Sequence, residues 1–387
     1  MASHRQELIG RARELAPLFA TRALQEEAKR SPLDETVQDL IGSGILATLT
    51  PRRYGGHELG VDTMAEITRI FSEACPSTGW IAAFYMGAAW RALMFPEQAQ
   101  REIFADKPYM LCAGQAAPLN RVSRVPGGYR ITGQTPWSSG SVHAEWITFV
   151  GVLIEEGVAP SPLAFLVPRA DTHLVDTWFV AGMRGTGSND MRVDDVFVPE
   201  YRTASFALAM SGATPGQTLH ANPMYSKPFL PFAMTEVVPV LVGAMRGAAN
   251  AFLRRTQERQ GTISGVKAAG KQAAQMRLAR TFARADAAEI LLADYLRIFI
   301  ADRPEQADLQ DRCGMKLKAA FITDLCRDGI NDIVRGIGGD GFRDASPLQR
   351  YFRDVNMLAV HAFLDIDTAA ESYGRMALGL PPEDMLL

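Results

Sequence analysis

The chain has 387 residues, of which 47% are hydrophobic and 21% charged, and its formal net charge is -3. This composition is typical of a folded globular protein rather than a disordered one. The small negative charge argues against a surface for nucleic acid or an anionic membrane. We see no uninterrupted apolar run near the roughly 20 residues that span a bilayer. Charges are spread through the N-terminal segment, which therefore lacks the apolar centre of a secretory signal, and we expect a cytoplasmic protein.

The four cysteines, Cys75, Cys112, Cys313 and Cys326, show no paired spacing. Their separation fits neither a zinc site nor a disulfide framework. The sequence thus indicates a reduced compartment and no metal centre.

Residues 1–109 are expected to form an N-terminal helical domain. Apolar residues recur at helical spacing in "QELIGRARELAPLFATRALQEEAKR". Two further helices are predicted in "VDTMAEITRIFSEACPSTGWIAAFYMGAAWRALMF", with a break near Pro76–Gly79.

Residues 110–205 change in character and are expected to form a compact antiparallel β domain. The predicted strands are short, rich in β-branched and aromatic residues, and separated by Gly, Pro and Asp turns. They are "GYRITGQTPW", "AEWITFVGVLI", "LAFLVPR" and "MRVDDVFVP".

Residues 206–387 follow as a C-terminal helical bundle. A loop at about 203–232 precedes long Ala-, Leu- and Arg-rich helices, and a helix ends at Gly338–Gly339. The segment "RDVNMLAVHAFLD", from Arg353 to Asp365, reads as the last apolar helix and carries a lone histidine, His361. The fold class is therefore α+β and mostly α, with three domains.

The order of these regions, together with four motifs, resembles the acyl-CoA dehydrogenase fold over essentially the whole chain. The motifs are "GYRITGQTPWSSGSVHAEW", "AGMRGTGSNDMRVDDVFVP", "RTQERQG" and "GIGGDGFRDASPLQRYFRD". The resemblance is sharper to one branch, the oxygenase components of two-component flavin-dependent monooxygenases, similar to the hydroxylases of 4-hydroxyphenylacetate and related phenols. The signs are "SSGSVHAEW", "MRGTGSND" and the histidine near the C-terminus.

This resemblance implies an activity and its partners. Reduced flavin, FMNH2 or FADH2, would come from a separate NAD(P)H-dependent flavin reductase and react with O2 to a C4a-hydroperoxyflavin. The product would be a hydroxylated small aromatic substrate, which is phenolic, polycyclic or indole-like. The family also implies a homotetramer, and we expect neither a nucleic-acid nor a membrane partner.

The resemblance further implies a set of flavin-binding residues. Ser139 would lie beside flavin N5, next to Ser138, while Trp137 either walls the ring or is an ordinary strand aromatic. Gln115 either bonds the pyrimidine edge of the ring or faces solvent. Arg259 would reach a flavin phosphate of a neighbouring subunit, or else lie solvated at a helix end. The glycines Gly338 and Gly339 would pack on the flavin, or only form a helix C-cap.

On the substrate side, the resemblance implies that His361 faces the substrate and accepts or holds its hydroxyl proton. His143 recurs in the branch and either contacts substrate or braces its loop. Candidate pocket walls are aromatic, and most are expected to prove core residues: Tyr85, Trp90, Tyr225 and Phe229. In "MRGTGSND" we favour a role for Arg184, Thr186 and Ser188 in bracing the β domain.

Three alternatives stay open, and one of them is a catalytically inactive flavin-binding or interaction protein. An acyl-CoA dehydrogenase needs a carboxylate base, and no glutamate lies between Arg353 and Asp365, although Glu258 lies near the family's other base position. An enzyme of the same fold that oxygenates nitrogen or sulfur is the third alternative.

Overall fold

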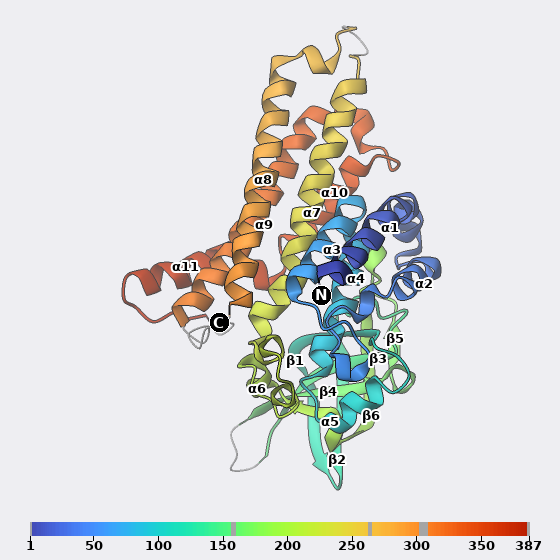
Figure 1. The fold of residues 1–387 in the computed structure, drawn as a ribbon, viewed down its shortest axis with the longest axis vertical. Helices are drawn as coiled ribbons and strands as arrows, with labels where there is room; N and C mark the ends of the chain where they lie inside the picture. The colour runs from blue at the N-terminus through green and yellow to red at the C-terminus, as the bar shows by residue number, and fades with distance from the viewer. Residues whose placement is uncertain (1, 156–159, 262–264, 302–308, 385–387) are drawn as a thin grey trace.

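The computed structural model of the protein describes residues 2–155, 160–261, 265–301 and 309–384. Helices precede and follow a central sheet (Figure 1). The helices are α1 (Ala2–Lys29), α2 (Asp34–Gly42), α3 (Val61–Ala74), α4 (Pro76–Ala92), α5 (Glu97–Ile103), α6 (Phe206–Met210), α7 (Phe229–Glu258), α8 (Gln272–Ile300), α9 (Leu309–Ile337), α10 (Pro347–Leu358) and α11 (Ile366–Ala377).

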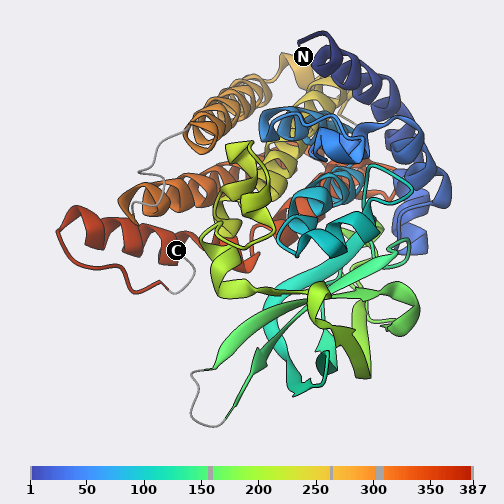
Figure 2. The same ribbon diagram turned by 60° about the horizontal axis from the view of Figure 1, so that its bottom comes forward.

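A seven-stranded sheet with the order β5-β6-β2-β1-β3-β4-β7 lies at one end of the molecule (Figures 1 and 2). The strands are β1 (Cys112–Val125), β2 (Gly128–Thr135), β3 (Trp146–Leu153), β4 (Ser161–Pro168), β5 (His173–Val175), β6 (Asp190–Pro199) and β7 (Thr203–Ser205). The sheet is antiparallel, as expected, except at one place: β1 and β3 pair in parallel.

The parallel pair follows from how the chain returns after the first hairpin. β1 and β2 form that hairpin, with Val125 opposite Gly128 at its turn. The chain then runs back to the start of β1, where the backbone N–H groups of Glu145 and Trp146 both donate to the carbonyl of Leu111. β3 therefore starts beside the start of β1 and must run in the same direction. The segment between β2 and β3 is left to form a loop against the helices.

Helix α7 is the central helix of the bundle and packs against α3, α4, α8, α9 and α10. It begins at Phe229, several residues before the predicted start, because Pro231 lies in the first turn, where no backbone N–H partner is needed. By length and composition α7 is apolar enough to cross a membrane, but 89% of its most apolar window is buried inside the protein. The helix is therefore accounted for by the protein core.

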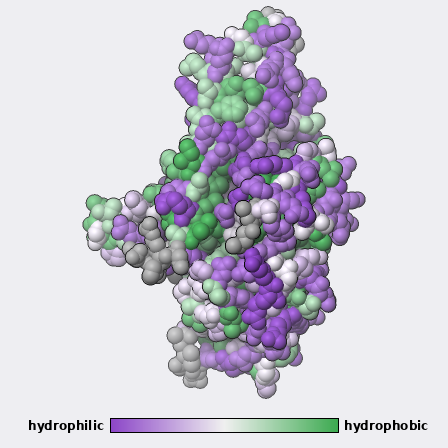
Figure 3. Space-filling model, viewed as in Figure 1, coloured by the Kyte–Doolittle hydropathy of each residue, from purple (hydrophilic) through white to green (hydrophobic). Residues whose placement is uncertain are grey.

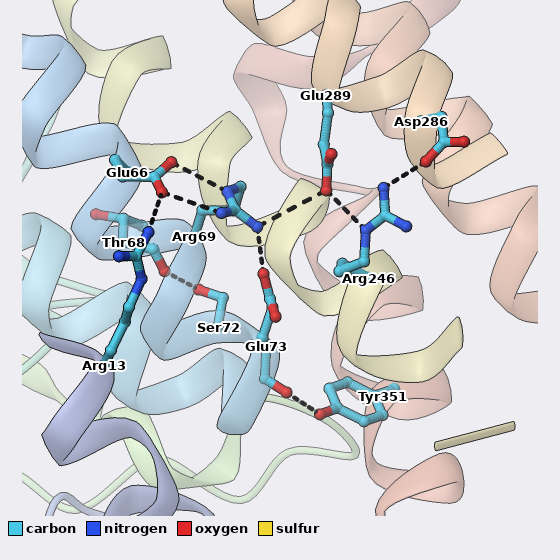
Figure 4. Close-up of polar contacts among 10 residues, drawn as sticks. All are labelled: Arg13, Glu66, Thr68, Arg69, Ser72, Glu73, Arg246, Asp286, Glu289 and Tyr351. Carbon is cyan, nitrogen blue, oxygen red and sulfur yellow. Dashed lines mark hydrogen bonds and ion pairs between the residues drawn. The ribbon is translucent and has the colours of Figure 1, made fainter. Parts of the chain in front are cut away.

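A cluster of ion pairs holds the helices around α7 together (Figure 4). On α3, Arg69 pairs with Glu73 and, at 3.7 Å, with Glu289 on α8. Glu289 also accepts from Arg246 on α7 at 2.8 Å. The hydroxyl of Tyr351 on α10 donates to the carbonyl of Glu73. The helices α3, α7, α8 and α10 are thereby joined at one level of the bundle.

Candidate active site

The loop that leaves β2 is fastened to a second loop of the β domain. The N–H of Ser138 donates to the carbonyl of Asn189 at 3.0 Å, and the N–H of Gly140 donates to the carbonyl of Thr186 at 3.0 Å. A side-chain bond from Ser141 to the carbonyl of Gly187, at 3.1 Å, adds a third tie. The "MRGTGSND" segment thus braces the "TPWSSG" loop, as expected.

Helix α4 closes this loop from the other side. The phenol of Tyr85 lies under the loop and donates to the carbonyl of Gly140 at 2.8 Å. Gly140 has φ +74°, and a Cβ there would lie 2.6 Å from the Tyr85 hydroxyl. A residue with a side chain would be both strained and crowded at this position.

A chain of hydroxyl groups runs through the contact between the two loops. The indole Nε1 of Trp80 donates to Oγ of Ser139 at 2.9 Å. That oxygen lies 2.8 Å from Oγ of Ser188, which lies 2.7 Å from Oγ1 of Thr186. Thr186 in turn donates to the carbonyl of Met183 at 2.9 Å. Ser139 is only 7% exposed, so these contacts dominate its surroundings.

Trp80 also brings Ser139 close to His361. Its ring stacks on Phe84 with a centroid separation of 4.6 Å and lies 5.9 Å from the imidazole centroid of His361. Ser139 and His361 are 222 positions apart in the sequence. The two residues implied as catalytic are therefore both neighbours of one indole, which the sequence did not single out.

His361 is not in a helix, and this prediction was wrong. Helix α10 ends at Leu358, and Val360 is 79% exposed. His361 instead caps a short turn at Ala362–Leu364, where its Nδ1 accepts from the N–H of Phe363 at 3.3 Å. Burial lowers the pKa of His361 to about 4, so the ring is neutral at pH 7. Because Nδ1 accepts, the single ring proton is on Nε2.

The backbone around the site is held in an unusual conformation at two positions. Trp137 has φ +60° and Met183 has φ +53°, both in the left-handed region that favours glycine. The Trp137 ring is 55% exposed and packs edge-to-face on Trp178, with centroids 5.4 Å apart. The Trp178 indole donates to the carbonyl of Met183 at 3.2 Å. Strain of this kind is often kept at functional sites.

A carboxylate that was not predicted from the sequence supports the same loop. Oδ1 of Asp354, on α10, accepts from the N–H of Met183 at 2.6 Å. Burial raises the pKa of Asp354 to about 7, and the backbone N–H of Met183 opposes that shift. The other oxygen, Oδ2, is buried without a partner among the described residues.

The remaining implied flavin residues lie in two separate places. Gln115 is in β1, and its side-chain Oε1 is buried with no partner in the described part of the chain. Arg259 follows the end of α7, where its Nη1 donates to the carbonyl of Gly336 at 2.8 Å. Gly338 is beside it, with φ +68°, and Gly339 follows. Figure 1 shows this end of α7 at the far end of the bundle from the sheet. One chain does not bring the two groups together.

The four aromatic residues predicted to line a pocket are buried, and their polar atoms are already paired. The hydroxyl of Tyr85 donates to the carbonyl of Gly140. The indole of Trp90 donates to the carbonyl of Met224 at 2.9 Å, and the hydroxyl of Tyr225 donates to the carbonyl of Leu49 at 2.8 Å. Phe229 lies beside Trp90, with centroids 6.4 Å apart. Contact of these residues with a substrate stays a prediction.

His143 joins the β domain to the N-terminal helices. Its Nε2 lies 2.9 Å from Oδ1 of Asp34, in the first turn of α2. Hydrogen bonds from Lys29 and His143 lower the pKa of Asp34 to about 2. This contact supports the bracing role that the sequence left open, while contact with substrate stays a prediction.

Comparisons with known proteins agree with this geometry. Residues 236–366 match the family model described as "Acyl-CoA dehydrogenase, C-terminal domain". The chain is 65% identical over 383 residues to a "Pigment production hydroxylase" of Rhodococcus sp. (strain ATCC 21145), which covers 99% of both chains. It is 32% identical to the "FADH(2)-dependent resorcinol hydroxylase, oxygenase component" of Rhizobium sp. (strain MTP-10005), covering 97% of this chain and 95% of that one.

A solved structure shows the same fold. "XiaF from Streptomyces sp. in complex with FADH2 and Glycerol" superposes with a TM-score of 0.89 at 30% identity, covering 100% of this chain and 98% of that chain. The matches extend over all three regions of the chain. Together with the site, they show that the chain belongs to the flavin-dependent monooxygenases with the acyl-CoA dehydrogenase fold, among the oxygenase components of that family.

Proposed function

We propose that the protein uses reduced flavin and O2 to hydroxylate an electron-rich carbon of a small phenolic, polycyclic or indole-like aromatic substrate. The observation that carries the proposal is that Ser139 and His361 both lie next to the indole of Trp80. The relatives support the substrate class, since one is named for resorcinol and another for pigment production. A separate NAD(P)H-dependent reductase is proposed to supply the flavin, because the relative named as an oxygenase component is one part of a larger system.

The residues of the β domain fit a flavin ring. Gln115 has a buried acceptor without a partner, which suits a ring N–H, and Ser139 offers a polar atom at the end of its loop. The exposed indole of Trp137 is free to cover an aromatic face. The bound reduced flavin would supply the activation of O2, and the buried loop would exclude water from it.

His361 is proposed to hold the substrate hydroxyl by donating to it. With Nδ1 committed to Phe363, the neutral ring presents an Nε2–H group and no free lone pair. A substrate oxygen facing Nε2 must then accept. The resemblance implied that His361 either accepts the proton of the substrate hydroxyl or holds that hydroxyl in place. The geometry fits the second role better.

The acyl-CoA dehydrogenase alternative is not supported by the site. Glu258 is exposed at the last residue of α7, at the end of the bundle far from the sheet. Two other carboxylates each hold a backbone N–H group, since Oδ1 of Asp354 accepts from Met183 and Oδ1 of Asp365 accepts from Thr368 at the start of α11.

We propose a homotetramer in the cytoplasm, where NAD(P)H is available to the reductase. Arg259 and Gly338 lie far from the ring site, so a phosphate contact to the same flavin would come from another copy. Apolar side chains are exposed along α8 (Figure 3), and Met276, Ile290 and Ile300 are 48, 69 and 47% exposed. Exposed apolar side chains on one helix suit association with a second copy.

The test is to mix the protein with reduced flavin anaerobically, and then with oxygenated buffer containing candidate phenols or indoles. Flavin reoxidation, followed at its visible absorption, is expected to be slower than for free flavin and to yield hydroxylated product with little hydrogen peroxide. Product analysis distinguishes carbon from nitrogen or sulfur oxygenation. Reduction of the flavin-loaded protein by an acyl-CoA would contradict the proposal.

A further inference from the structure

The hydroxyl chain that ends at Ser139 has as many protons as hydrogen bonds, and this fixes the direction of every bond. Four contacts join Trp80, Ser139, Ser188, Thr186 and the carbonyl of Met183. The indole has one N–H and each hydroxyl has one O–H, which gives four protons for four bonds. If all four bonds are made, no proton is left for any other partner.

The direction of each hydrogen bond follows from the Met183 end of the chain. A carbonyl cannot donate, so Thr186 donates to Met183 and must accept from Ser188. The proton of Ser188 is then used, so Ser188 accepts from Ser139. At the other end the indole of Trp80 can only donate. Ser139 therefore donates to Ser188, accepts from Trp80, and has one lone pair left.

From this count we infer that Thr186 and Ser188 act as positioning residues that make Ser139 an obligatory acceptor, so that the site selects the reduced flavin ring. The inference rests on the proposed function, in which Ser139 lies beside flavin N5. Reduced flavin carries a hydrogen on N5 and can donate to Ser139. Oxidised flavin has a lone pair on N5, which would face the lone pair of Ser139.

The oxidised ring can be accepted only if a bond of the chain is broken. Ser139 would have to turn its proton from Ser188 toward N5, leaving a buried oxygen without a donor. The chain is therefore expected to favour reduced over oxidised flavin by about tenfold, which corresponds to about 1.4 kcal/mol and is the size of effect expected for one lost neutral hydrogen bond. For a two-electron couple, a tenfold preference raises the reduction potential of the bound flavin by about 30 mV.

The test measures dissociation constants of the full-length protein for FADH2 and FAD, and for FMNH2 and FMN, under anaerobic conditions. In Ser188→Ala, Ser139 loses its acceptor and is free to donate outward. In Thr186→Val, Ser188 loses its acceptor and can donate to Ser139, with the same result. Both variants are expected to bind oxidised flavin about tenfold more tightly than the wild type, with little change for reduced flavin. A loop that was merely damaged would not gain affinity.

Two further variants complete the set. Thr186→Ser keeps the hydroxyl, and we expect the wild-type ratio of the dissociation constants for oxidised and reduced flavin. Ser141→Ala removes a buried hydroxyl from the same loop, whose bond to Gly187 lies outside the chain, and is also expected to keep it. An unchanged ratio in both Ser188→Ala and Thr186→Val overturns the inference, as does an equal gain in Ser141→Ala.

The wild type separates the two levels of the proposal. If it binds both redox forms of the flavin equally, the inference fails while the proposed function stands. If the wild type binds neither FMNH2 nor FADH2, the proposed function fails and the inference fails with it.

Discussion

The carboxylate of Asp354 accepts the backbone N–H of Met183 at 2.6 Å, which ties the end of α10 to the loop that supports Ser139. The same helix leads, a few residues later, into the turn that is capped by His361. One side chain therefore couples the positions of both implied catalytic residues. Replacing Asp354 by Ala leaves the buried N–H of Met183 unpaired, and we expect a loss of about 1–3 kcal/mol in the free energy of unfolding.

Asp354→Asn is the matched variant, since it keeps an oxygen acceptor but cannot ionise. The folded-state pKa of Asp354 is about 7, above its ordinary value of 3.8. Its protonated form therefore stabilises the fold below pH 4, and this contribution is lost as the pH rises from about 4 to about 7. Relative to Asp354→Asn, the wild type should lose stability over that range in denaturant titrations. A difference that does not depend on pH would contradict the assigned burial effect.

The two roles of His361 can be separated by substitution. If its Nε2–H donates to the substrate, His361→Gln keeps a donor on a similar reach, and we expect kcat/KM to fall less than about tenfold. His361→Phe removes the donor and should cost more than the glutamine variant does. A general base contributes about 10²–10⁴-fold, so a loss of that size in His361→Gln would show that the ring takes a proton.

The pH dependence of hydroxylation gives an independent check on His361. Because burial lowers its pKa to about 4, the ring stays neutral from pH 5.5 upward. Single-turnover rates measured with preloaded reduced flavin should show no ionisation near pH 6.5 that His361→Gln removes. A change in rate near pH 6.5 that the wild type shows and His361→Gln lacks would contradict this prediction. It would show that the imidazole is more exposed to solvent than the structure indicates.

Trp80→Phe tests the contact that joins the site. The variant keeps an aromatic ring beside Phe84 but removes the indole N–H that Ser139 accepts. We expect a loss of about 1 kcal/mol in stability and a severalfold increase in hydrogen peroxide released per flavin reoxidised. Tyr295→Phe removes a comparable buried bond, to the carbonyl of Pro231 at 2.8 Å, and should leave the peroxide yield unchanged. Equal yields in the two variants would count against a role for Trp80.

Gly338→Ala tests the far cofactor group. A Cβ at Gly338 would lie 2.4 Å from Nη2 of Arg259, so alanine should displace the guanidinium from its place on Gly336. Gly127→Ala is the control, because Gly127 also has a positive φ, +81°, but no atom lies within 4 Å of the added carbon. Both variants should lose on the order of 1–3 kcal/mol of stability, because a residue with a side chain is strained at a positive φ. Only Gly338→Ala should weaken flavin binding, and equal affinities would remove Arg259 from the proposed cofactor site.

The sequence predicted elements better than it predicted contacts between them. Helical periodicity and strand composition report local burial, and the segments so predicted appear in the structure with shifted ends. The ends shifted where the local pattern was ambiguous. The apolar spacing of "VNMLAVHAFLD" continues past Leu358, although the helix stops there, and the prolines near Phe229 suggested a loop where α7 had already begun.

The site was predicted only where a motif carried it. Ser139 and His361 followed from the resemblance, but Trp80 lies in the uniformly apolar α4, where nothing in the spacing distinguishes one aromatic from another. Its partner Ser139 is 59 residues away, and Asp354 is 171 residues from Met183. Pairings over such separations are set by the tertiary fold, so a single sequence does not reveal them. The parallel pairing of β1 and β3 was missed for the same reason.

The four groups that position Ser139 are an indole, two alcohols and a backbone carbonyl, and none of them ionises in the physiological range. The orientation of the Ser139 hydroxyl is therefore insensitive to proton concentration and to salt, unlike a site built from carboxylates and imidazoles. Only exchange of an atom by mutation, or local opening of the two loops, can reverse it. The contribution of Ser139 to the preference for reduced over oxidised flavin would therefore not change with pH as long as the two loops stay folded.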